Sequence, residues 1–552
     1  MSERNLCARL VSSLEKGILT ERVESYPELK SISVLRGERL NFQLFLRTEV
    51  TGDWRTRRFE ITVEGLDASA REVKNVFADL PYYGVDKSRE NGMTVESPSG
   101  LYPDVLEPID SGVYLRPKDE TLTAVWFEAT PREAGVLGVS VVIKENGEQI
   151  ASLPLTVTVV DAALPEQSTI FTQWFYCDCL ASYYDVPVFS EKHWQIVRNF
   201  MACAVRHGIN FILTPVFTPP LDTEIGTERP TVQLVGVVKN GGEYSFDFSL
   251  LKRWLDMARD VGVRYFEIAH LFTQWGAANA PKVVATVDGI ERRIFGWHTP
   301  GKEGEYPRFL AKFLPELVAF LKAEGVFERC RFHISDEPGE AQFESYVKAR
   351  NLVEPYIDGA VIMDAMSSVK FLKEGAVTTP IPATSGIEPF LAEDIAERWT
   401  YYCCGEFNKV GNRFIAYPQY RNRILGVQFY KFNITGFLQW GYNYYYSVGA
   451  RRLINPYINT SADGQLQSGD SFSVYPGPMG TPLASTRLAV FHEALQDVEA
   501  LKLAESVVGR GKVVALIDEL AGEPVTFSEY PKSAEYILTL REKVNEIIEE
   551  KL

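Results

Sequence analysis

Short segments in which apolar and polar residues alternate dominate the first part of the chain, from about residue 30 to residue 160. The clearest of these segments are residues 40–48, 58–65, 122–130 and 136–143. Alternation places the apolar side chains on one face of a strand, and regularly spaced Gly, Pro, Asp and Asn turns favour an antiparallel all-β arrangement. We therefore predict an N-terminal β-sandwich that ends at Pro165.

After Pro165 the pattern changes to short apolar runs separated by longer amphipathic stretches. Eight runs are typical of buried strands, at residues 169–176, 209–217, 265–272, 330–335, 360–366, 376–384, 400–407 and 434–442. The stretches 191–208, 249–262 and 307–325 have a helical pattern, and each ends at a glycine. Eight units of strand followed by helix predict a (β/α)8 TIM barrel.

The end of the chain is helical in pattern from about residue 485. The sequence as a whole thus predicts a multidomain protein. We assign residues 1–165 to the N-terminal β-sandwich, residues 166–510 to a (β/α)8 barrel catalytic domain of the α/β class, and residues 511–552 to a C-terminal helical extension packed on the barrel.

Composition and charge narrow the classes of partner. A hydrophobic content of 45% supports a large core, and 57 Lys and Arg against 73 Asp and Glu give a formal net charge of -16. Such a charge repels phosphate backbones, so we predict no nucleic-acid partner. The opening residues lack the apolar core of a signal peptide and no apolar run reaches membrane-spanning length, which predicts a cytoplasmic protein without a membrane partner. Assembly as a homo-oligomer is compatible with these features.

The segment RFHISDEPGE, residues 331–340, carries the strongest chemical signal. Active sites of TIM barrels lie at the C-terminal ends of the strands, and Asp336 and Glu337 directly follow the fourth predicted strand. Pro338 and Gly339 end that strand, so the turn can direct both carboxyl groups into the barrel mouth. Acidic residues here could instead cap a helix. Their position after a barrel strand favours catalysis, in which one carboxylic acid protonates a glycosidic oxygen and its neighbour stabilises positive charge.

Aromatic and polar side chains at or just beyond the predicted strands, together with Trp297 between the third and fourth, are candidates for sugar binding. Aromatic faces pack against the CH-rich faces of sugar rings, although a half-buried core position is the competing interpretation for any one of them. On this basis we predict substrate contacts for His270, Trp275, Trp297, Tyr402, Trp440 and Asn443. His333 lies within a predicted strand and is expected to have its hydrogen bonds satisfied inside the barrel.

No sequence pattern requires a cofactor or a metal ion. The chain has no HExxH, Walker, GxGxxG-helix or GxSxG pattern. It therefore lacks the sequence motifs of metalloproteases, NTPases, dinucleotide-binding proteins and α/β-hydrolases. A divalent ion on Asp336, Glu337 and Asp364 is conceivable, but the histidines are not spaced as its partners. The seven cysteines lack paired CxxC spacing. We predict free thiols, no cofactor and no metal.

Several of these segments together resemble glycoside hydrolase family 123, a group that overlaps many uncharacterised bacterial proteins. The resemblance rests on HLFTQWGAANAPKV (270–283), FHISDEPGE (332–340), FLQWGYNYYY (437–446), GDSFSVYPG (469–477) and STRLAVFHEALQDVEAL (485–501). It spans roughly residues 165 to 510, and the predicted sandwich matches the N-terminal domain usual in that family.

The resemblance implies a retaining exo-β-N-acetylgalactosaminidase that uses substrate-assisted catalysis. In that scheme the 2-acetamido oxygen of the substrate attacks the anomeric carbon and forms an oxazolinium-type intermediate. Glu337 would be the general acid/base, and Asp336 would orient the acetamido group. Two alternatives stay open: a conventional retaining glycosidase with Glu406 or Asp364 as nucleophile, and a carbohydrate-binding protein without catalytic activity.

Overall fold

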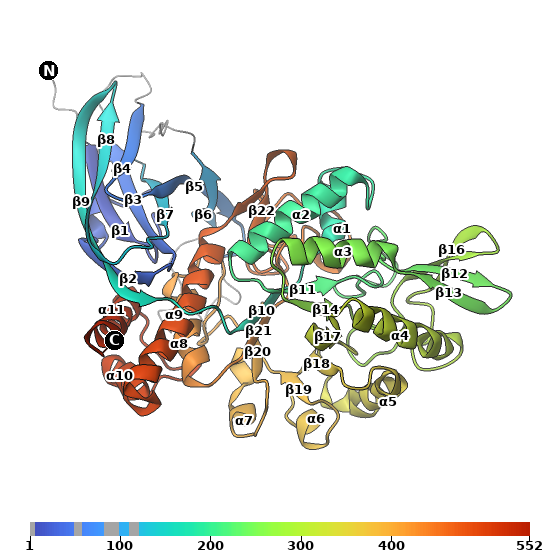
Figure 1. Ribbon diagram of the computed structural model, residues 1–552. Coiled ribbons are helices and arrows are strands. Elements are labelled where there is room, and N and C mark those ends of the chain that lie inside the picture. The colour runs from blue at the N-terminus through green and yellow to red at the C-terminus, as the bar shows by residue number, and fades with distance from the viewer. Residues whose placement is uncertain (1–5, 49–57, 82–98, 110–120, 552) are drawn as a thin grey trace.

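The computed structural model describes residues 6–48, 58–81, 99–109 and 121–551. Two sheets face each other in the N-terminal region, which confirms the predicted β-sandwich (Figure 1). The five-stranded sheet has the order β1-β3-β7-β5-β6 and the four-stranded sheet the order β2-β9-β8-β4. Their strands are β1 (Leu6–Ser12), β2 (Ser31–Arg36), β3 (Leu40–Thr48), β4 (Phe59–Glu64), β5 (Ala68–Ala78), β6 (Gly100–Pro108), β7 (Thr123–Ala129), β8 (Gly135–Glu145) and β9 (Glu148–Ala163).

The alternating pattern of the sequence becomes the core of this sandwich. In β4, Phe59 and Ile61 are buried between exposed neighbours. Phe42 of β3 and Phe127 of β7 stack with their ring centroids 5.0 Å apart. Most strand pairs are antiparallel, as alternation with short turns favours, but β2 pairs with β9 in parallel.

Eight parallel strands form the barrel, in the order β19-β18-β17-β14-β11-β10-β21-β20. A parallel bridge from Ala383 to Tyr401 joins the two edges and nearly closes it. The strands are β10 (Ile170–Gln173), β11 (Phe211–Thr214), β14 (Tyr265–Ile268), β17 (Cys330–Phe332), β18 (Val361–Ala365), β19 (Thr379–Ile381), β20 (Trp399–Tyr401) and β21 (Gly436–Gln439). Each overlaps one of the eight predicted runs, so the predicted barrel is confirmed.

Helices follow the barrel strands and surround them (Figure 1). They are α1 (Cys177–Tyr183), α2 (Glu191–Arg206), α3 (Ser249–Asp260), α4 (Glu305–Ala323), α5 (Phe343–Val353), α6 (Lys370–Lys373), α7 (Glu388–Leu391), α8 (Tyr420–Lys431) and α9 (Thr486–Val508). The hydroxyl of Ser190 caps α2 by accepting a hydrogen bond from the backbone of His193. The two helices α6 and α7 are single turns, so this side of the barrel has a thinner helical cover.

A small sheet that the sequence pattern did not predict is inserted in the barrel. Its strands are β12 (Gly236–Asn240), β13 (Glu243–Asp247), β15 (Val283–Val287) and β16 (Ile290–Phe295), in the order β13-β12-β15-β16. The sheet projects from the barrel beyond β14 (Figure 1). Its strands are partly exposed, and β16 reads IERRIF, so their weak alternation does not stand out from a polar loop.

The C-terminal helices contact both domains. After α9 come α10 (Arg510–Ala521) and α11 (Ala534–Lys551). Contacts of α11 reach α9 and α8 of the barrel and also β2 and β9 of the sandwich. The guanidinium of Arg541 on α11 lies 2.6 Å from the carboxylate of Glu38 in the sandwich. The extension is therefore a bridge between sandwich and barrel.

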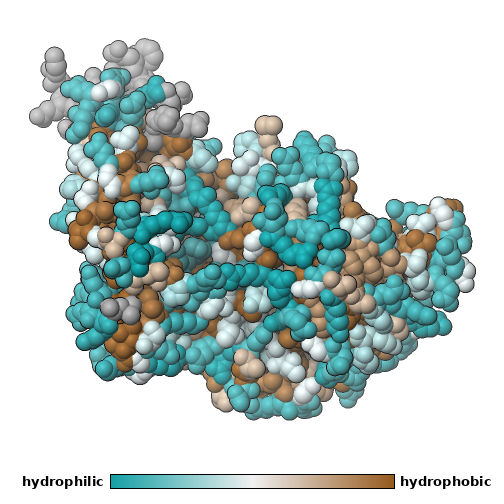
Figure 2. All heavy atoms as spheres, in the orientation of Figure 1, coloured by the Kyte–Doolittle hydropathy of each residue, from teal (hydrophilic) through white to brown (hydrophobic). Residues whose placement is uncertain are grey.

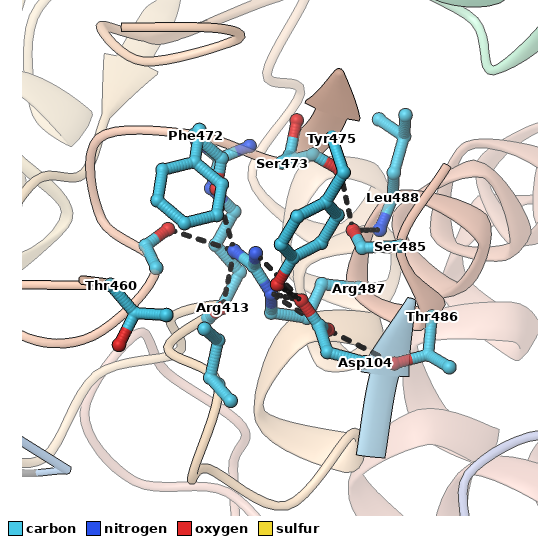
Figure 3. A network of polar contacts seen from close by, with 12 residues as sticks. Asp104, Arg413, Thr460, Phe472, Ser473, Tyr475, Ser485, Thr486, Arg487 and Leu488 are labelled. Atoms are coloured by element: carbon cyan, nitrogen blue, oxygen red, sulfur yellow. Dashed lines mark hydrogen bonds and ion pairs between the residues drawn. The ribbon is translucent and has the colours of Figure 1, made fainter. Parts of the chain in front are cut away.

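A buried ion pair also joins the two domains (Figure 3). Asp104 on β6 and Arg487 at the start of α9 are fully buried, with Nη2 of the arginine 2.9 Å from Oδ2 of the aspartate. Tyr475, on the short hairpin of β22 (Val474–Pro476) and β23 (Pro482–Ala484), donates its hydroxyl to the same carboxylate at 2.6 Å. Arg487 also donates to the carbonyls of Gly469 and Phe472. The sandwich thus supplies the anion for a cation of the barrel domain.

Hydrophilic residues cover much of the face shown in Figure 2, in keeping with the high charge of the chain. Within the described ranges, none of the helices combines the length and the apolar character that a membrane crossing requires.

Candidate active site

A cavity of about 660 Å³ opens at the C-terminal ends of the barrel strands. Asp336 and Glu337 both line it, as predicted from their position after the fourth strand. Aromatic side chains form much of its wall: Trp174, Trp275, Trp297, Tyr401, Trp440 and Tyr444. Acidic groups set among aromatic faces suit a ligand with polar hydroxyls and apolar ring faces.

The turn that carries the acidic pair has an unusual backbone. β17 ends at Phe332, and Glu337 has a φ of +44°, a left-handed conformation that costs energy for a residue with a Cβ. Hydrogen bonds hold this turn on both sides: the amide of Glu337 donates to the carbonyl of Ala365 at 3.1 Å, and the carbonyl of Asp336 accepts from the amide of Trp275 at 2.9 Å. The bent backbone lets two adjacent carboxyl groups face one cavity.

The loop after β14 supports the acidic turn. Trp275, Gly276 and Ala277 all have positive φ values, of 58°, 101° and 55°. The hydroxyl of Ser335 donates to the carbonyl of Thr273 at 2.9 Å and accepts from the amide of Ala277 at 3.2 Å. These bonds fix Trp275, whose side chain is 61% exposed, at the rim of the cavity next to the acidic pair.

Tyr401 holds the carboxylate of Glu337. Its hydroxyl donates a hydrogen bond to Oε1 of Glu337 at 2.5 Å. Burial, together with the charge of Glu337, raises the pKa of Tyr401, so this hydroxyl keeps its proton and remains a donor. Sequence reasoning missed this residue and chose its neighbour Tyr402.

The carboxyl group of Asp336 is in a setting that favours its neutral form. Burial raises its pKa well above the ordinary value, and the charges of Glu337, Asp222 and Asp364 raise it further. Within the described residues no side-chain donor contacts this carboxyl group. The carboxyl group of Asp336 therefore retains its proton to higher pH than an exposed aspartate would.

Asp222 is a third acidic residue on the cavity wall that sequence reasoning missed. It follows β11 by eight residues, in a loop where its φ is +55°, and position after a strand does not single it out. Its carboxylate accepts a hydrogen bond from the hydroxyl of Tyr176 at 3.1 Å. Burial raises its pKa to about 6, partly offset by Arg229.

A chain of buried polar groups lies beneath the cavity. Glu267 accepts hydrogen bonds from Trp174 at 2.6 Å and from Nε2 of His333 at 2.8 Å. Nδ1 of His333 lies 3.0 Å from Asp364, which also accepts from the hydroxyl of Tyr346 at 2.6 Å. Burial alone would lower the pKa of His333, but its bonds to the two carboxylates raise it to about 10. His333 is thus a barrel residue with both nitrogens satisfied, as the sequence predicted, and its raised pKa favours the protonated form.

Three of the predicted substrate contacts lie on the cavity wall and three do not. Trp275, Trp297 and Trp440 line the cavity, and the indole of Trp440 donates to Asp470 at 3.0 Å. The other three, His270, Tyr402 and Asn443, are buried outside its lining.

The three buried residues make internal contacts instead. His270 stacks on His333 with the ring centroids 4.2 Å apart. The hydroxyl of Tyr402 donates to Asn422 at 3.3 Å. The side chain of Asn443 makes two hydrogen bonds with the backbone of Tyr176. In two cases the neighbouring residue, Tyr401 or Tyr444, lines the cavity, because successive side chains point to opposite sides of an extended chain.

His270, His333 and Asp364 form the one group of potential metal ligands found in the described part of the chain, with ligand atoms within 4.8 Å of one another. Neither ring nitrogen of His270 has a hydrogen-bond partner among the described residues. The other two are already engaged, since both nitrogens of His333 and both oxygens of Asp364 make hydrogen bonds. A metal ion here would have to displace these bonds, and the acidic pair takes no part in the group.

A (β/α)8 barrel with an acidic pair between aromatic walls is an arrangement found in glycoside hydrolases. Residues 174–504 match the profile described as "Glycoside hydrolase 123, catalytic domain". The chain belongs to glycoside hydrolase family 123. No curated protein matches it.

One solved structure of the same family has the same fold. The chain is similar to a family 123 glycoside hydrolase from Clostridium perfringens whose structure was analysed for glycolipid glycan hydrolysis, with 17% identity, a TM-score of 0.72, and coverage of 99% of this chain and 98% of that one. A family 39 glycoside hydrolase from Bacteroides cellulosilyticus is less similar, with 10% identity, a TM-score of 0.34, and coverage of 85% and 81%.

Proposed function

We propose that this glycoside hydrolase is a retaining exo-β-N-acetylgalactosaminidase that uses the acetamido group of its substrate as the nucleophile. Glu337 protonates the glycosidic oxygen as it leaves, while the acetamido oxygen attacks the anomeric carbon. Asp336 accepts a hydrogen bond from the acetamido N–H and stabilises the positive charge that develops on the ring. Water then opens the oxazolinium-type intermediate, with Glu337 as the general base.

The adjacency of Asp336 and Glu337 on one strained turn carries this proposal. A nucleophile supplied by the substrate removes the need for a second enzyme carboxylate across the sugar ring. The raised pKa of Asp336 fits the same scheme. An acetamido N–H bound to Asp336 favours its ionised form, so substrate binding moves the proton of Asp336 to the neighbouring Glu337, from which the leaving oxygen takes it.

The conventional two-carboxylate mechanism has weaker support. Asp364 and Glu406, its candidate nucleophiles, are both buried and lie outside the lining of the cavity. Asp364 is occupied by His333 and Tyr346, and Glu406 accepts from the hydroxyl of Ser385 at 2.8 Å and the amide of Cys403 at 2.9 Å. A conventional mechanism would have to use Asp222 instead, and would predict turnover of sugars without an acetamido group.

Nitrophenol release from four aryl β-glycosides tests the proposal. The panel consists of the N-acetylgalactosaminide, the N-acetylglucosaminide, the galactoside and the glucoside. We expect selective turnover of the N-acetylgalactosaminide, and turnover of the plain galactoside would overturn substrate assistance. Glu337→Gln should lose activity on poor leaving groups and keep part of it on activated aryl glycosides, because proton donation matters less to them. Asp336→Asn should lower the turnover of substrates with poor leaving groups and of activated aryl glycosides alike. Binding of N-acetylhexosamines without any turnover would instead indicate a binding protein.

A further inference from the structure

A second cavity, of about 360 Å³, adjoins the first. The two share the residues Thr223, Ile225 and Trp297 on their walls, so they lie side by side. Pro219 and Pro220 give the second cavity a rigid apolar side. A space of this size next to the acidic pair suits one further sugar unit of a longer substrate.

The two cavities carry opposite charge. The first is lined by Asp222, Glu224, Asp336 and Glu337, and its one arginine, Arg451, is paired with Glu224. The second cavity is mainly basic, although the chain as a whole has a net charge of -16. A basic wall in an acidic protein attracts an anion locally while the rest of the surface repels it.

The basic wall of the second cavity has more positive than negative groups. It is lined by Arg229, Lys282 and Arg293, and Glu228 is the one acidic residue that the described chain places there. Arg293 is paired with Glu228. The charge of Arg229 is balanced from behind by Asp178, at 3.3 Å.

Lys282 is the most weakly paired of the three cations. Its ammonium donates one hydrogen bond to the carbonyl of Arg229 at 2.5 Å and lies 3.8 Å from Glu228, which Arg293 already engages. An ammonium has three N–H donors, so two remain for a ligand. Its side chain is only 16% exposed, and burial lowers its pKa, so an anion in the cavity would favour its charged form.

We propose that the second cavity is a subsite for an acidic, carboxylate-bearing sugar unit on the leaving-group side of the substrate. This inference rests on the proposed function, because the terminal sugar is taken to occupy the first cavity. Lys282 and Arg293 bind the carboxylate, and Trp297 packs against the sugar at the junction of the cavities. The negative first cavity repels the same carboxylate, so the charges orient the substrate with its acidic unit outward.

Two disaccharides that differ only at C6 of the second sugar test this subsite: β-N-acetylgalactosaminyl-(1,4)-glucuronate and β-N-acetylgalactosaminyl-(1,4)-glucose, both as methyl glycosides. At low ionic strength we expect kcat/KM to be roughly tenfold higher for the uronate, mainly through KM. The preference should fall with added salt. Equal kcat/KM values for the two disaccharides would overturn the proposal.

Substitutions in the second cavity test whether the preference for the uronate arises there. Lys282→Met should abolish the preference and Arg293→Met should reduce it. The control is Arg292→Met, because Arg292 is adjacent to Arg293 on β16, is exposed, and lines neither cavity. The preference of the Arg292→Met variant for the uronate should equal that of the unmodified protein. Full preference retained in both the Lys282 and Arg293 variants would contradict a role for this cavity.

A binding measurement separates this inference from the proposed function. Failure to cleave either disaccharide would count against the exo-β-N-acetylgalactosaminidase activity, and the subsite would then be judged by calorimetric titration with methyl β-glucuronide and methyl β-glucoside. Selective binding of the glucuronide that is lost in Lys282→Met supports the subsite. Equal binding of the two glycosides, or none of either, overturns it.

Discussion

The hydroxyl of Tyr401 lies 2.5 Å from Oε1 of Glu337 and joins the seventh barrel strand to the turn after the fourth. A hydrogen bond to a charged group contributes about 1.5–3 kcal/mol. We therefore expect Tyr401→Phe to lower kcat/KM by roughly ten- to a hundredfold on the substrate that the protein hydrolyses. The loss should be in kcat, because the bond positions a reacting group.

Tyr402→Phe is the matched control for this prediction. Tyr402 is the next residue, is equally aromatic, and points away from the cavity toward Asn422. Its kinetic constants should stay within about twofold of the unmodified protein, as changes away from the site usually do. Equal losses in the two variants would mean that the tyrosines act through packing alone.

Asp336→Asn should stabilise the protein in a pH-dependent way. The folded-state pKa of Asp336 is raised by burial and by Glu337, whereas the unfolded chain ionises near the ordinary value. Stability associated with this group is therefore full below the unfolded pKa and falls as pH rises through the folded pKa. The variant escapes this loss, so its Tm should match the unmodified protein near pH 3.5 and exceed it by about 2 °C or more at pH 8. A difference in Tm between the two proteins that stays constant with pH would argue against a raised pKa of Asp336.

His333→Gln should destabilise the fold most at a pH of about 6.5 or below, and still strongly at pH 7. The pKa of His333 is raised to about 10, so its contribution is full below about 6.5, the ordinary histidine value, and is lost as pH rises through 10. Removing the charge leaves Glu267 and Asp364 without their buried partner, which costs about 3–5 kcal/mol. Urea unfolding at pH 7 should show this deficit, and the deficit should shrink at pH 10. The exposed His298 provides the control substitution, with little change at either pH.

Asp104→Asn should weaken the joint between the domains. The change leaves Arg487 buried without its anion, again at a cost of about 3–5 kcal/mol. We expect a lower Tm in calorimetry and a separate transition for the sandwich. Glu107→Gln, on the same strand but half exposed beside Lys74, should leave a single unshifted transition. An unaltered melting curve for Asp104→Asn would show that the interface does not depend on this pair.

The barrel could be predicted from the sequence because its parallel strands are buried on both faces and stand out as apolar runs. The inserted sheet could not, since strands such as Ile290–Phe295 are largely polar and half exposed. Asp336 and Glu337 were found because they follow a short apolar run and precede Pro338 and Gly339, although the strand itself ends earlier than predicted, at Phe332. Tyr401 was missed because pattern alone does not fix which of two adjacent tyrosines faces inward, and a one-residue error reverses the side.

The buried pair of Asp104 and Arg487 connects the sandwich to the wall of the cavity. Arg487 binds the carbonyls on either side of Asp470, and Asp470 in turn accepts the indole hydrogen of Trp440 on the cavity wall. A tryptophan of the cavity wall is thus anchored, three contacts away, by a residue of another domain. The two domains therefore depend on each other: a barrel joined to a different N-terminal domain would lose the buried counter-ion of Arg487.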